Sequence, residues 1–422
     1  MTTAAAPTDL LYSEAEEELR SAVRALLTDR SDAKSVLDRA ETGSPHDPAL
    51  WHSLAAGIGA AGLLVPEKLG GQGASHREAA VVLEELGRAV APAPYLTSAV
   101  LATEILLGCD TAEAAPLLRE LASGSTVCVP TVPLTLAPGA PLPAPVRDLG
   151  DGILTGTVTS VADAVAADVL LVLADTGLHA VPAAAARLAP SIPLDLTRPL
   201  ATVTLEAAAG TRLADLGTAR AAIAGALLSG AGLLASEQLG IAEWCLTETV
   251  GHVRGRHQFN RPVGSFQALK HRLARLWLDV ASARAAARAA ADALATSAPD
   301  APLTVAVAQA YCSGVAVRAA EECVQLHGGI GMTWEHPAHL YLKRATGRSL
   351  SSPHDGHHHR ALRHRAARPP RRTRRPAPRR GRRRLLPRLP RRAGPARRRR
   401  LVGLPAARRR GRLPRPVGLP HR

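Results

Sequence analysis

The strongest constraint on the fold is an abrupt change of composition at about residue 346. Residues 346–422 contain 27 arginines, no lysine and one acidic residue, Asp355. Prolines interrupt this segment throughout, and its apolar residues follow neither a helical nor a strand period. The segment cannot bury enough apolar surface to offset the conformational entropy lost on ordering. We therefore expect residues 346–422 to be a disordered Arg/Pro-rich tail, and the folded part to lie in residues 1–345.

This tail has two interpretations. An arginine-rich arm would bind nucleic acid or an anionic membrane through phosphate contacts and the release of counterions. Alternatively, DNA rich in guanine and cytosine that is translated out of frame yields Arg, Pro, Ala and Gly without Lys. The complete lack of lysine favours a frameshifted C-terminus over a functional arm, so nucleic-acid binding is not expected. For the same reason we do not expect the histidines of "HDGHHH", residues 354–359, to form a metal site.

The rest of the chain has the composition of an ordinary globular protein. Without the tail it carries 25 basic and 35 acidic residues, although the whole sequence has a net charge of +16. Its N-terminus lacks the basic and apolar segments of a signal peptide, and no uninterrupted apolar run is long enough to span a membrane. Five scattered cysteines without CxxC spacing indicate reduced, buried thiols. We expect a cytoplasmic protein with two or three hydrophobic cores.

Residues 1–125 are expected to form a helical domain. Capping boxes, in which a serine is followed three residues later by glutamate, predict helix starts at Ser13 and Ser75. Asp47 followed by proline predicts a third start, with the aspartate as N-cap and the proline at the first helical position. Apolar residues recur at three- and four-residue steps after these starts, as on the buried face of a helix.

The pattern then changes twice. Residues 126–212 hold short runs of Val, Leu and Thr separated by Gly, Pro and Asp, such as "GILTGTVTSV", which predict a small β domain. Residues 213–345 return to long apolar-striped segments that predict an antiparallel helical bundle, with Ser265 as candidate N-cap of the helix that continues through Val280. The predicted fold class is therefore α+β and multidomain.

Two segments of the predicted bundle suit a phosphate ligand. "CVQLHGGIGMTW" places Gly328, Gly329 and Gly331 directly after a long helix. Such glycines also form ordinary left-handed caps, and their spacing is not that of a dinucleotide-binding strand–turn–helix. In "RGRHQFNRPVGSFQ", however, Arg256 and Arg261 bracket a turn before the next helix. Exposed backbone amides together with a fixed guanidinium suit a pyrophosphate.

These two motifs and the order of the three parts closely resemble the acyl-CoA dehydrogenases, especially the bacterial flavoproteins of that family. "GLLVPEKLGGQGAS" and "VVLEELGRAVAP" in the N-terminal part resemble the family as well, and the resemblance covers about residues 8–345. It implies FAD as cofactor, an acyl-CoA substrate, a homo- or hetero-tetramer of dehydrogenase subunits, and electron-transfer flavoprotein as electron acceptor. In the family reaction a carboxylate removes the α proton of the thioester while the β hydride passes to the flavin.

The resemblance also implies which residues contact the cofactor. Two groups are expected at a flavin dinucleotide bound largely by a neighbouring subunit. They are Arg256, Phe259 and Gln267 in the first motif, and Gln325, Gly328 and Gly329 in the second. Glycine would let that backbone approach the diphosphate closely.

The catalytic base is missing from the positions where the family carries it. Counting along the chain from the two motifs gives Ser352 for the usual site and Gly230 for the alternative site, and neither is a carboxylate. Glu237 and Glu243 belong to the same predicted helix as Gly230 but lie seven and thirteen residues away. Since seven residues are nearly two turns, or about 10 Å along a helix, neither is assigned as the base.

The predicted β domain departs from the family too. Ser160 and Ala162 stand where a tryptophan and a hydroxyl pair usually flank the flavin ring. Three hypotheses follow: a subunit that relies on a partner for the base, a complete enzyme whose base was lost to a frameshift, or a non-enzymatic Arg-tailed nucleic-acid binder. The first explains best why the cofactor motifs are kept while the base is absent.

The remaining candidate side chains are given structural roles. His336 and His339 are spaced for one helix face but have no third ligand in the sequence, so no metal site is expected. His327 suits either a phosphate contact or an ordinary hydrogen bond. Trp277 and Trp334 are expected to pack within the protein.

Overall fold

The computed structural model describes residues 10–351, and every structural statement below concerns these residues. The tail predicted for residues 346–422 and Ser352 lie outside them, except for the last turns of helix α10 (Ala338–Ser351). This helix continues past the predicted start of the tail because the first proline after it is Pro353.

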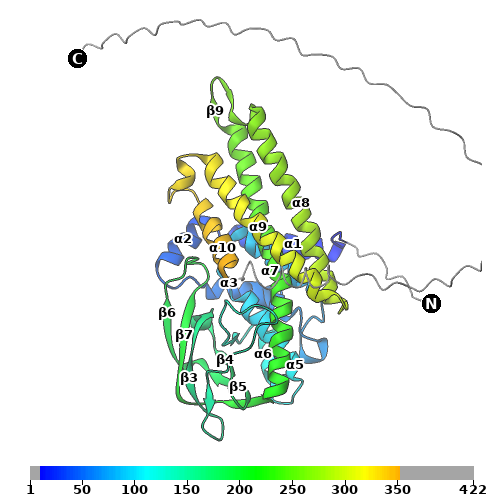
Figure 1. Ribbon diagram of the computed structural model, residues 1–422, viewed down its shortest axis with the longest axis vertical. Helices are drawn as coiled ribbons and strands as arrows, with labels where there is room; N and C mark the ends of the chain where they lie inside the picture. The colour runs from blue at the N-terminus through cyan, green and yellow to red at the C-terminus, as the bar shows by residue number, and fades with distance from the viewer. Residues whose placement is uncertain (1–9, 352–422) are drawn as a thin grey trace, which may run out of the picture. The chain divides into compact units, whose positions relative to one another are not determined.

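The predicted order of a helical part, a β part and a helical bundle is confirmed (Figure 1). The N-terminal part consists of short helices, most of them α-helical and the rest 3₁₀ or π. They are α1 (Glu14–Arg30), α2 (Ala33–Glu41), α3 (Pro48–His52), η1 (Ser53–Gly57), η2 (Ala60–Gly62), η3 (Glu67–Leu69), α4 (His76–Ala89), η4 (Tyr95–Ala102), α5 (Thr103–Cys109) and α6 (Ala114–Ala122).

The predicted starts of three of these helices are confirmed. The hydroxyl of Ser13 accepts the backbone N–H of Glu16, whose carboxylate accepts the N–H of Ser13 in return. Ser75 and Glu78 form the same capping box at α4. Asp47 caps α3 by accepting two N–H groups of its first turn. Each cap satisfies donors that have no partner inside the helix.

The β part consists of two four-stranded sheets. The first has the order β1-β4-β5-β8, in which only β1 and β4 are parallel, and the second has the antiparallel order β2-β3-β7-β6. The strands are β1 (Cys128–Pro130), β2 (Arg147–Asp148), β3 (Ile153–Ala162), β4 (Val169–Leu173), β5 (Gly177–Pro182), β6 (Arg187–Ser191), β7 (Leu200–Ala209) and β8 (Thr211–Asp215), with short 3₁₀ turns η5 (Ala164–Ala166) and η6 (Ala183–Ala185).

The bundle is built on one very long helix, α7. Its elements are α7 (Leu216–Gly255), a small hairpin of β9 (His257–Gln258) and β10 (Arg261–Pro262), η7 (Val263–Ser265), α8 (Gln267–Ala295), α9 (Ala301–His327), η8 (Ile330–Met332) and α10. The predicted N-cap at Ser265 is wrong by one residue. Ser265 ends the 3₁₀ turn η7, and Phe266 takes the N-cap position without a side-chain cap. The extra turn keeps the serine hydroxyl out of reach of the first amides of α8.

Helix α7 packs against both the N-terminal helices and the rest of the bundle, and two glycines allow this. A Cβ at Gly87 of α4 would lie 2.1 Å from the carbonyl oxygen of Glu237, and one at Gly240 of α7 would lie 1.9 Å from that of Glu84. The two backbones therefore touch where α4 crosses α7. Helices α8 and α9 pack against other faces of α7. The core that these helices enclose consists mainly of Ala, Leu and Val.

Helices α7 and α9 are long and apolar enough, by length and composition, to cross a membrane. In each of them 56% of the most apolar window is buried inside the structure. Packing within the bundle accounts for this apolar composition. All five cysteines are buried and unpaired by disulfide bonds, as predicted.

Candidate functional site

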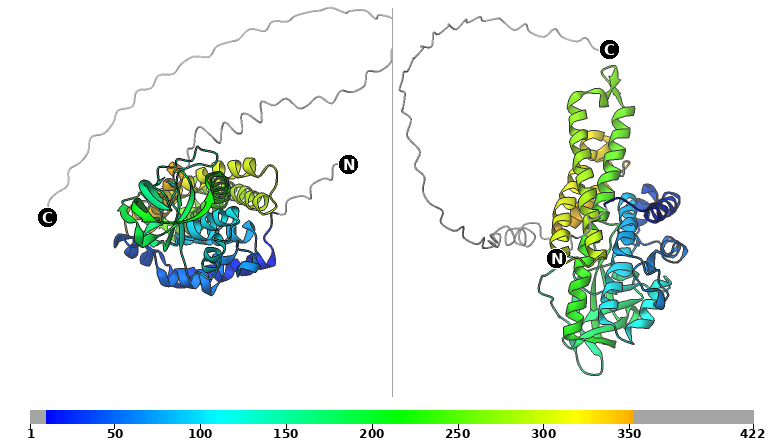
Figure 2. Two further views of the ribbon diagram at one scale, coloured as in Figure 1. Left: turned by 90° about the horizontal axis from the view of Figure 1, so that it is seen from below. Right: turned by 90° about the vertical axis from the view of Figure 1, so that its right-hand side faces the viewer.

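The first predicted cofactor motif forms the turn between α7 and α8. In the right-hand view of Figure 2 this end of the two helices extends past the N-terminal helices. Arg256 caps the end of α7: its N–H donates to the carbonyl oxygen of His252, and its own carbonyl oxygen accepts the N–H of Val263. The side chains of Arg256, Phe259 and Gln267 are all exposed. The three residues lie on one turn, which faces away from the core of the chain.

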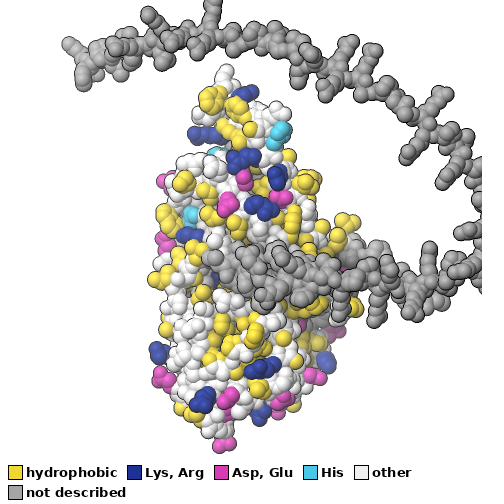
Figure 3. Space-filling view, in the orientation of Figure 1, with side chains coloured by type: hydrophobic (Ala, Val, Ile, Leu, Met, Phe, Trp, Pro, Cys, Tyr) yellow, Lys and Arg dark blue, Asp and Glu magenta, His cyan; other side chains and the backbone are white. Residues whose placement is uncertain are grey.

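Aromatic contacts shape this turn. Phe259 has a left-handed backbone, with φ 53°, and its side chain is 85% exposed. Its ring stands edge-on to Phe266, with centroids 6.0 Å apart, and the guanidinium of Arg261 lies 3.9 Å from the centroid of that same ring. Figure 3 shows hydrophobic and basic side chains together at this end of the molecule. An exposed aromatic held in a strained backbone suits a surface that binds something outside the chain.

The second motif forms the loop after α9. Gly328 has φ 66° and ψ −135°, a backbone conformation open essentially to glycine alone. Gly329 has an ordinary helical backbone, and a Cβ there would meet nothing within 4 Å. Nothing in the described part of the chain therefore requires glycine at 329, whereas a ligand approaching the backbone from outside would. Gln325, one turn earlier, is exposed as well.

Three histidines bring the two motifs together. The ring of His252, one turn before Arg256 on α7, lies 4.2 Å from the ring of His327 between centroids. His327, the last residue of α9, lies 4.1 Å from the ring of His336 in the loop before α10. The glycine loop is thus packed against the end of α7 that carries Arg256, and residues about seventy positions apart meet at one surface.

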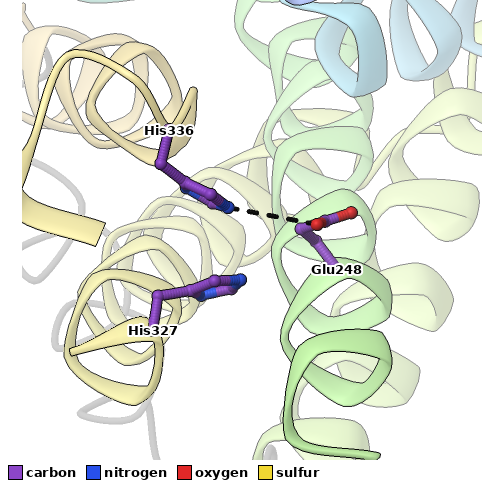
Figure 4. Close-up of side chains that lie close together, drawn as sticks. All are labelled: Glu248, His327 and His336. Atoms are coloured by element: carbon purple, nitrogen blue, oxygen red, sulfur yellow. Dashed lines mark ion pairs between the residues drawn. The ribbon is translucent and has the colours of Figure 1, made fainter. Parts of the chain in front are cut away.

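The structure brings His336 close to residues other than His339. It does not group with His339; instead its Nε2 lies 3.9 Å from Glu248 Oε1, and a metal-ligating atom from each of Glu248, His327 and His336 lies within 4.8 Å of the others (Figure 4). Sequence reasoning missed Glu248 because nothing in the sequence indicates that its turn of α7 faces the loop.

Gly230 lies among apolar side chains. It is buried in α7, and a Cβ there would lie 2.6 Å from Leu101 Cδ2 and 3.9 Å from Leu96 Cδ1, both in η4. A side chain at residue 230 would thus have to displace the end of the Leu101 side chain. Ser352, the other position, lies outside the described residues.

The two nearby glutamates are bound inside the fold. Glu237 pairs with Arg198 at 2.6 Å and with Arg344 at 3.3 Å. Glu243 pairs with Arg284, and more distantly with Arg88 at 4.0 Å. Both carboxylates are therefore engaged by arginines within the fold.

The end of strand β3 lies beside a second buried charge pair. Ser160 has φ 58° within an irregular stretch of β3, and Ala162 is buried. The adjacent Asp163 accepts the hydroxyl of Thr97 at 2.7 Å and lies 3.3 Å from Nε2 of His46. This pair ties the N-terminal helices to the β part and could not be inferred from sequence spacing.

The two tryptophans that were expected to pack within the protein are more than half exposed in the described chain. Trp277 is 62% exposed and Trp334 is 58% exposed. Trp334 stands edge-on to His339 and lines a cavity of about 570 Å³ between α2 and the loop before α10. Lys343 Nζ lies 4.2 Å from its ring centroid, a cation–π contact at the surface.

Comparison with known proteins defines the class. Residues 13–125 match the family description "Acyl-CoA dehydrogenase, N-terminal domain" and residues 220–350 match "Acyl-CoA dehydrogenase, C-terminal domain". The chain belongs to the acyl-CoA dehydrogenase family, as the sequence predicted. It is thus an FAD-dependent oxidoreductase by family.

Individual members of the family and solved structures are similar to the chain over most of its length. The chain is 37% identical to the acyl-CoA dehydrogenase IpdE2 of Mycolicibacterium smegmatis over 79% of this chain and 93% of that protein. Among solved structures it is similar to the ChsE4-ChsE5 complex of Mycobacterium tuberculosis, with TM-score 0.74 and 27% identity over 86% of this chain and 100% of the other. It is also similar to a variant of the Tcur3481-Tcur3483 steroid ACAD, with TM-score 0.70 and 29% identity over 83% of this chain and 96% of the other.

The exposed residues of the two motifs fit the flavin dinucleotide that the family implies. An open glycine at 329 and a guanidinium at 256 on adjoining turns are suited to a diphosphate, which accepts hydrogen bonds from both. Residue 230, in contrast, is a glycine beside apolar side chains and carries no group that could accept a proton.

Proposed function

We propose that this chain is one subunit of a hetero-oligomeric acyl-CoA dehydrogenase. It would contribute the Arg256 turn and the Gly328–Gly329 loop to a flavin site, while a partner subunit contributes the catalytic base. The observation that carries this proposal is the glycine at residue 230, where the chain has no carboxylate and where a Cβ would lie 2.6 Å from Leu101 Cδ2. The chain would thus keep its cofactor contacts but have no carboxylate at one of the two places for a base.

The chemistry explains why this combination points to a partner. Abstraction of the α proton needs a carboxylate beside the thioester, with its pKa matched to that acidified proton. Bound FAD would supply the hydride acceptor. Arg256 would neutralise phosphate charge, and Gly328 and Gly329 would allow the backbone to approach the diphosphate. Binding and orientation are thus the tasks that this chain's own residues can perform.

Two similar structures support the same assembly. The ChsE4-ChsE5 and Tcur3481-Tcur3483 structures are each named for a pair of proteins, and the second is described as a steroid dehydrogenase. We propose by this likeness that the substrate is a bulky, steroid-type acyl-CoA thioester.

The decisive experiment compares the chain alone with the chain co-expressed with a dehydrogenase subunit that carries a glutamate at the family's base position. We expect the visible absorbance of bound flavin and acyl-CoA oxidation, measured with a ferrocenium acceptor, only in the co-purified complex. Replacing the partner's glutamate by glutamine should abolish oxidation but leave bound flavin. Turnover by the purified chain alone would contradict the proposal and favour a complete homomeric enzyme.

A matched set of variants tests the assignment of this chain's cofactor contacts. Arg256→Ala should lower the flavin content of the complex about tenfold, because a charge-assisted phosphate contact is lost. Gly329→Ala should also weaken flavin binding but leave the unfolding temperature unchanged, since a Cβ there meets nothing within 4 Å. Arg254→Ala, an exposed arginine on the same helix, is the control. Equal flavin content in the parent and all three variants would contradict the assignment.

The alternative of a complete enzyme with a frameshifted C-terminus has a separate test. Resequencing the codons for residues 335–360 shows whether another frame continues "HLYLKRA" as an ordinary helical sequence. A glutamate in that frame where Ser352 stands would restore the base within this chain and remove the need for a partner. Confirmation of the printed frame would leave the partner-dependent subunit as the function to test.

A further inference from the structure

A cluster of metal-ligating side chains lies beneath the glycine loop. It consists of Glu248 on α7, His327 at the end of α9 and His336 in the loop before α10, which we call the His/Glu cluster. One ligating atom from each of the three lies within 4.8 Å of the others, and Figure 4 shows the two histidine rings directed toward the glutamate. Three separate segments of the chain thus converge on one point.

The central histidine of this cluster, His327, has one ring nitrogen that is free to coordinate a metal ion. His327 is only 6% exposed, and its Nδ1 lies 2.7 Å from the carbonyl oxygen of Cys323. Because a carbonyl oxygen can only accept, Nδ1 carries the proton and Nε2 carries a lone pair. That Nε2 is buried and has no hydrogen-bond partner among the described residues. A carbonyl on one ring nitrogen and a free lone pair on the other is the arrangement that orients metal-bound histidines.

The second histidine, His336, is engaged through one ring nitrogen, since its Nδ1 accepts the N–H of Ala338 at 3.2 Å. Coordination through Nε2 would require the ring proton to move to Nδ1, or the ring to turn over, at the cost of this single long hydrogen bond.

We propose that Glu248, His327 and His336 form a site for a divalent first-row metal ion such as Zn²⁺. Two imidazoles and one carboxylate are a common ligand set for such ions, and three protein ligands leave a position for water. Bonds of about 2.1 Å would bring the ligand atoms to roughly 3.4 Å from one another. Glu248 Oε1 is already 3.9 Å from His336 Nε2, and its side chain is 47% exposed and can close the remaining gap.

The location gives the ion a structural role. Glu248 belongs to α7, whereas His327 and His336 flank the loop that contains Gly328 and Gly329. A bound ion would hold this loop against the helix that carries Arg256. Metal binding should therefore stabilise the native state, because the site is assembled only when these segments are folded.

The test is titration of the full-length chain with Zn²⁺, and separately with Co²⁺, by calorimetry and visible absorption. His354, His357, His358 and His359 are first replaced by alanine, so that the tail does not bind the probe. We expect one equivalent of Zn²⁺, a Co²⁺ spectrum of low coordination number, and a rise in unfolding temperature with the metal. Glu248→Gln and His336→Gln should each weaken this binding at least tenfold, and His327→Ala should abolish it.

His339→Ala is the matched control, because this histidine lies near the loop but outside the His/Glu cluster. Its binding should equal that of the parent protein. If His327→Ala fails to fold, Glu248→Gln still decides the matter, since its half-exposed side chain is not part of the core. Undetectable binding, or the same stoichiometry and affinity in parent and Glu248→Gln proteins, would overturn the proposal and identify any bound ion as adventitious.

Discussion

Gly230 has no side chain and therefore cannot act as the catalytic base. A side chain there would point at Leu101, so a carboxylate would have to displace the end of this buried leucine side chain. Overpacking and burial of an ionisable group without a partner both destabilise a fold. Residue 230 therefore lacks a carboxylate and lies beside an apolar side chain.

We predict that Gly230→Glu creates no active enzyme. The substitution should instead reduce the free energy of unfolding by at least ~3 kcal/mol, measured by urea denaturation. Adding Leu101→Ala should recover part of that loss by making room for the carboxylate. Acyl-CoA oxidation by the single variant without a partner would show that the position is open to substrate after all.

His46 and Asp163 form a buried pair whose contribution depends on pH. Burial disfavours protonated His46, but the Asp163 carboxylate outweighs it and raises the pKa of His46. Burial also favours protonated Asp163, and His46 outweighs that effect, so the pKa of Asp163 is lowered. Both side chains are therefore charged at pH values between the lowered pKa of Asp163 and the raised pKa of His46.

The sign of the effect follows from linkage. The pKa of His46 in the folded protein lies above its ordinary value of 6.5. The contribution of protonated His46 to the free energy of unfolding is therefore fully present below pH 6.5, and it is lost as the pH rises through the folded pKa. We therefore expect the stability difference between wild type and His46→Gln to be larger at pH 6 than at pH 9. Thermal unfolding at both pH values measures it, and a difference independent of pH would show that His46 does not titrate in the pair.

At the scale of elements, the crossing of α4 and α7 depends on two glycines. The backbone contacts at Gly87 and Gly240 leave no room for a methyl group on either helix. Gly225 lies on the same helix α7, but a Cβ there would meet nothing within 4 Å. The three positions allow steric contact to be separated from helix propensity.

We expect Gly87→Ala and Gly240→Ala each to destabilise the chain by about 1–3 kcal/mol, the usual cost of overpacking. Gly225→Ala should stabilise it by about 0.5–1 kcal/mol, because alanine loses less backbone entropy in a helix. Chemical denaturation of the three variants is the measurement. A destabilising Gly225→Ala, or a neutral Gly240→Ala, would show that the helices do not touch at this crossing.

The same scale shows what local sequence could predict. The capping boxes at Ser13 and Ser75 are correct because each depends on residues three positions apart. Ser265 is wrong because a 3₁₀ turn, invisible to a search for capping residues, precedes α8. The short β runs predicted the β part, but the parallel pairing of β1 with β4 depends on residues about forty positions apart and leaves no local signal.

At the scale of the whole molecule, the parts of the site that a family motif contains were predicted, and those that arise from packing were not. Arg256 and the glycine loop could be proposed from sequence, although their contact with a cofactor remains a prediction. The approach of Glu248 to His336 results from the way α9 and α10 pack on α7. Contacts of this kind can be found only from the tertiary structure, because the sequence around each residue contains no signal of them.

Arg344 joins three distant segments of the chain and is only 1% exposed. From α10 it contacts Asp195 at 2.5 Å, the Thr197 hydroxyl at 2.7 Å and Glu237 of α7 at 3.3 Å. Asp195 and Thr197 lie between β6 and β7. This arginine therefore connects the β part to the bundle through buried charges.

We predict that Arg344→Met reduces the free energy of unfolding by about 3–5 kcal/mol, because it takes a charged partner away from two buried carboxylates. Arg318→Met is the matched control: its ion pair with Asp279, at 3.3 Å, has a half-exposed arginine and should contribute no more than about 1 kcal/mol. Urea denaturation of both variants measures the contrast. Losses of similar size would mean that the three segments are held together by apolar packing rather than by this buried arginine.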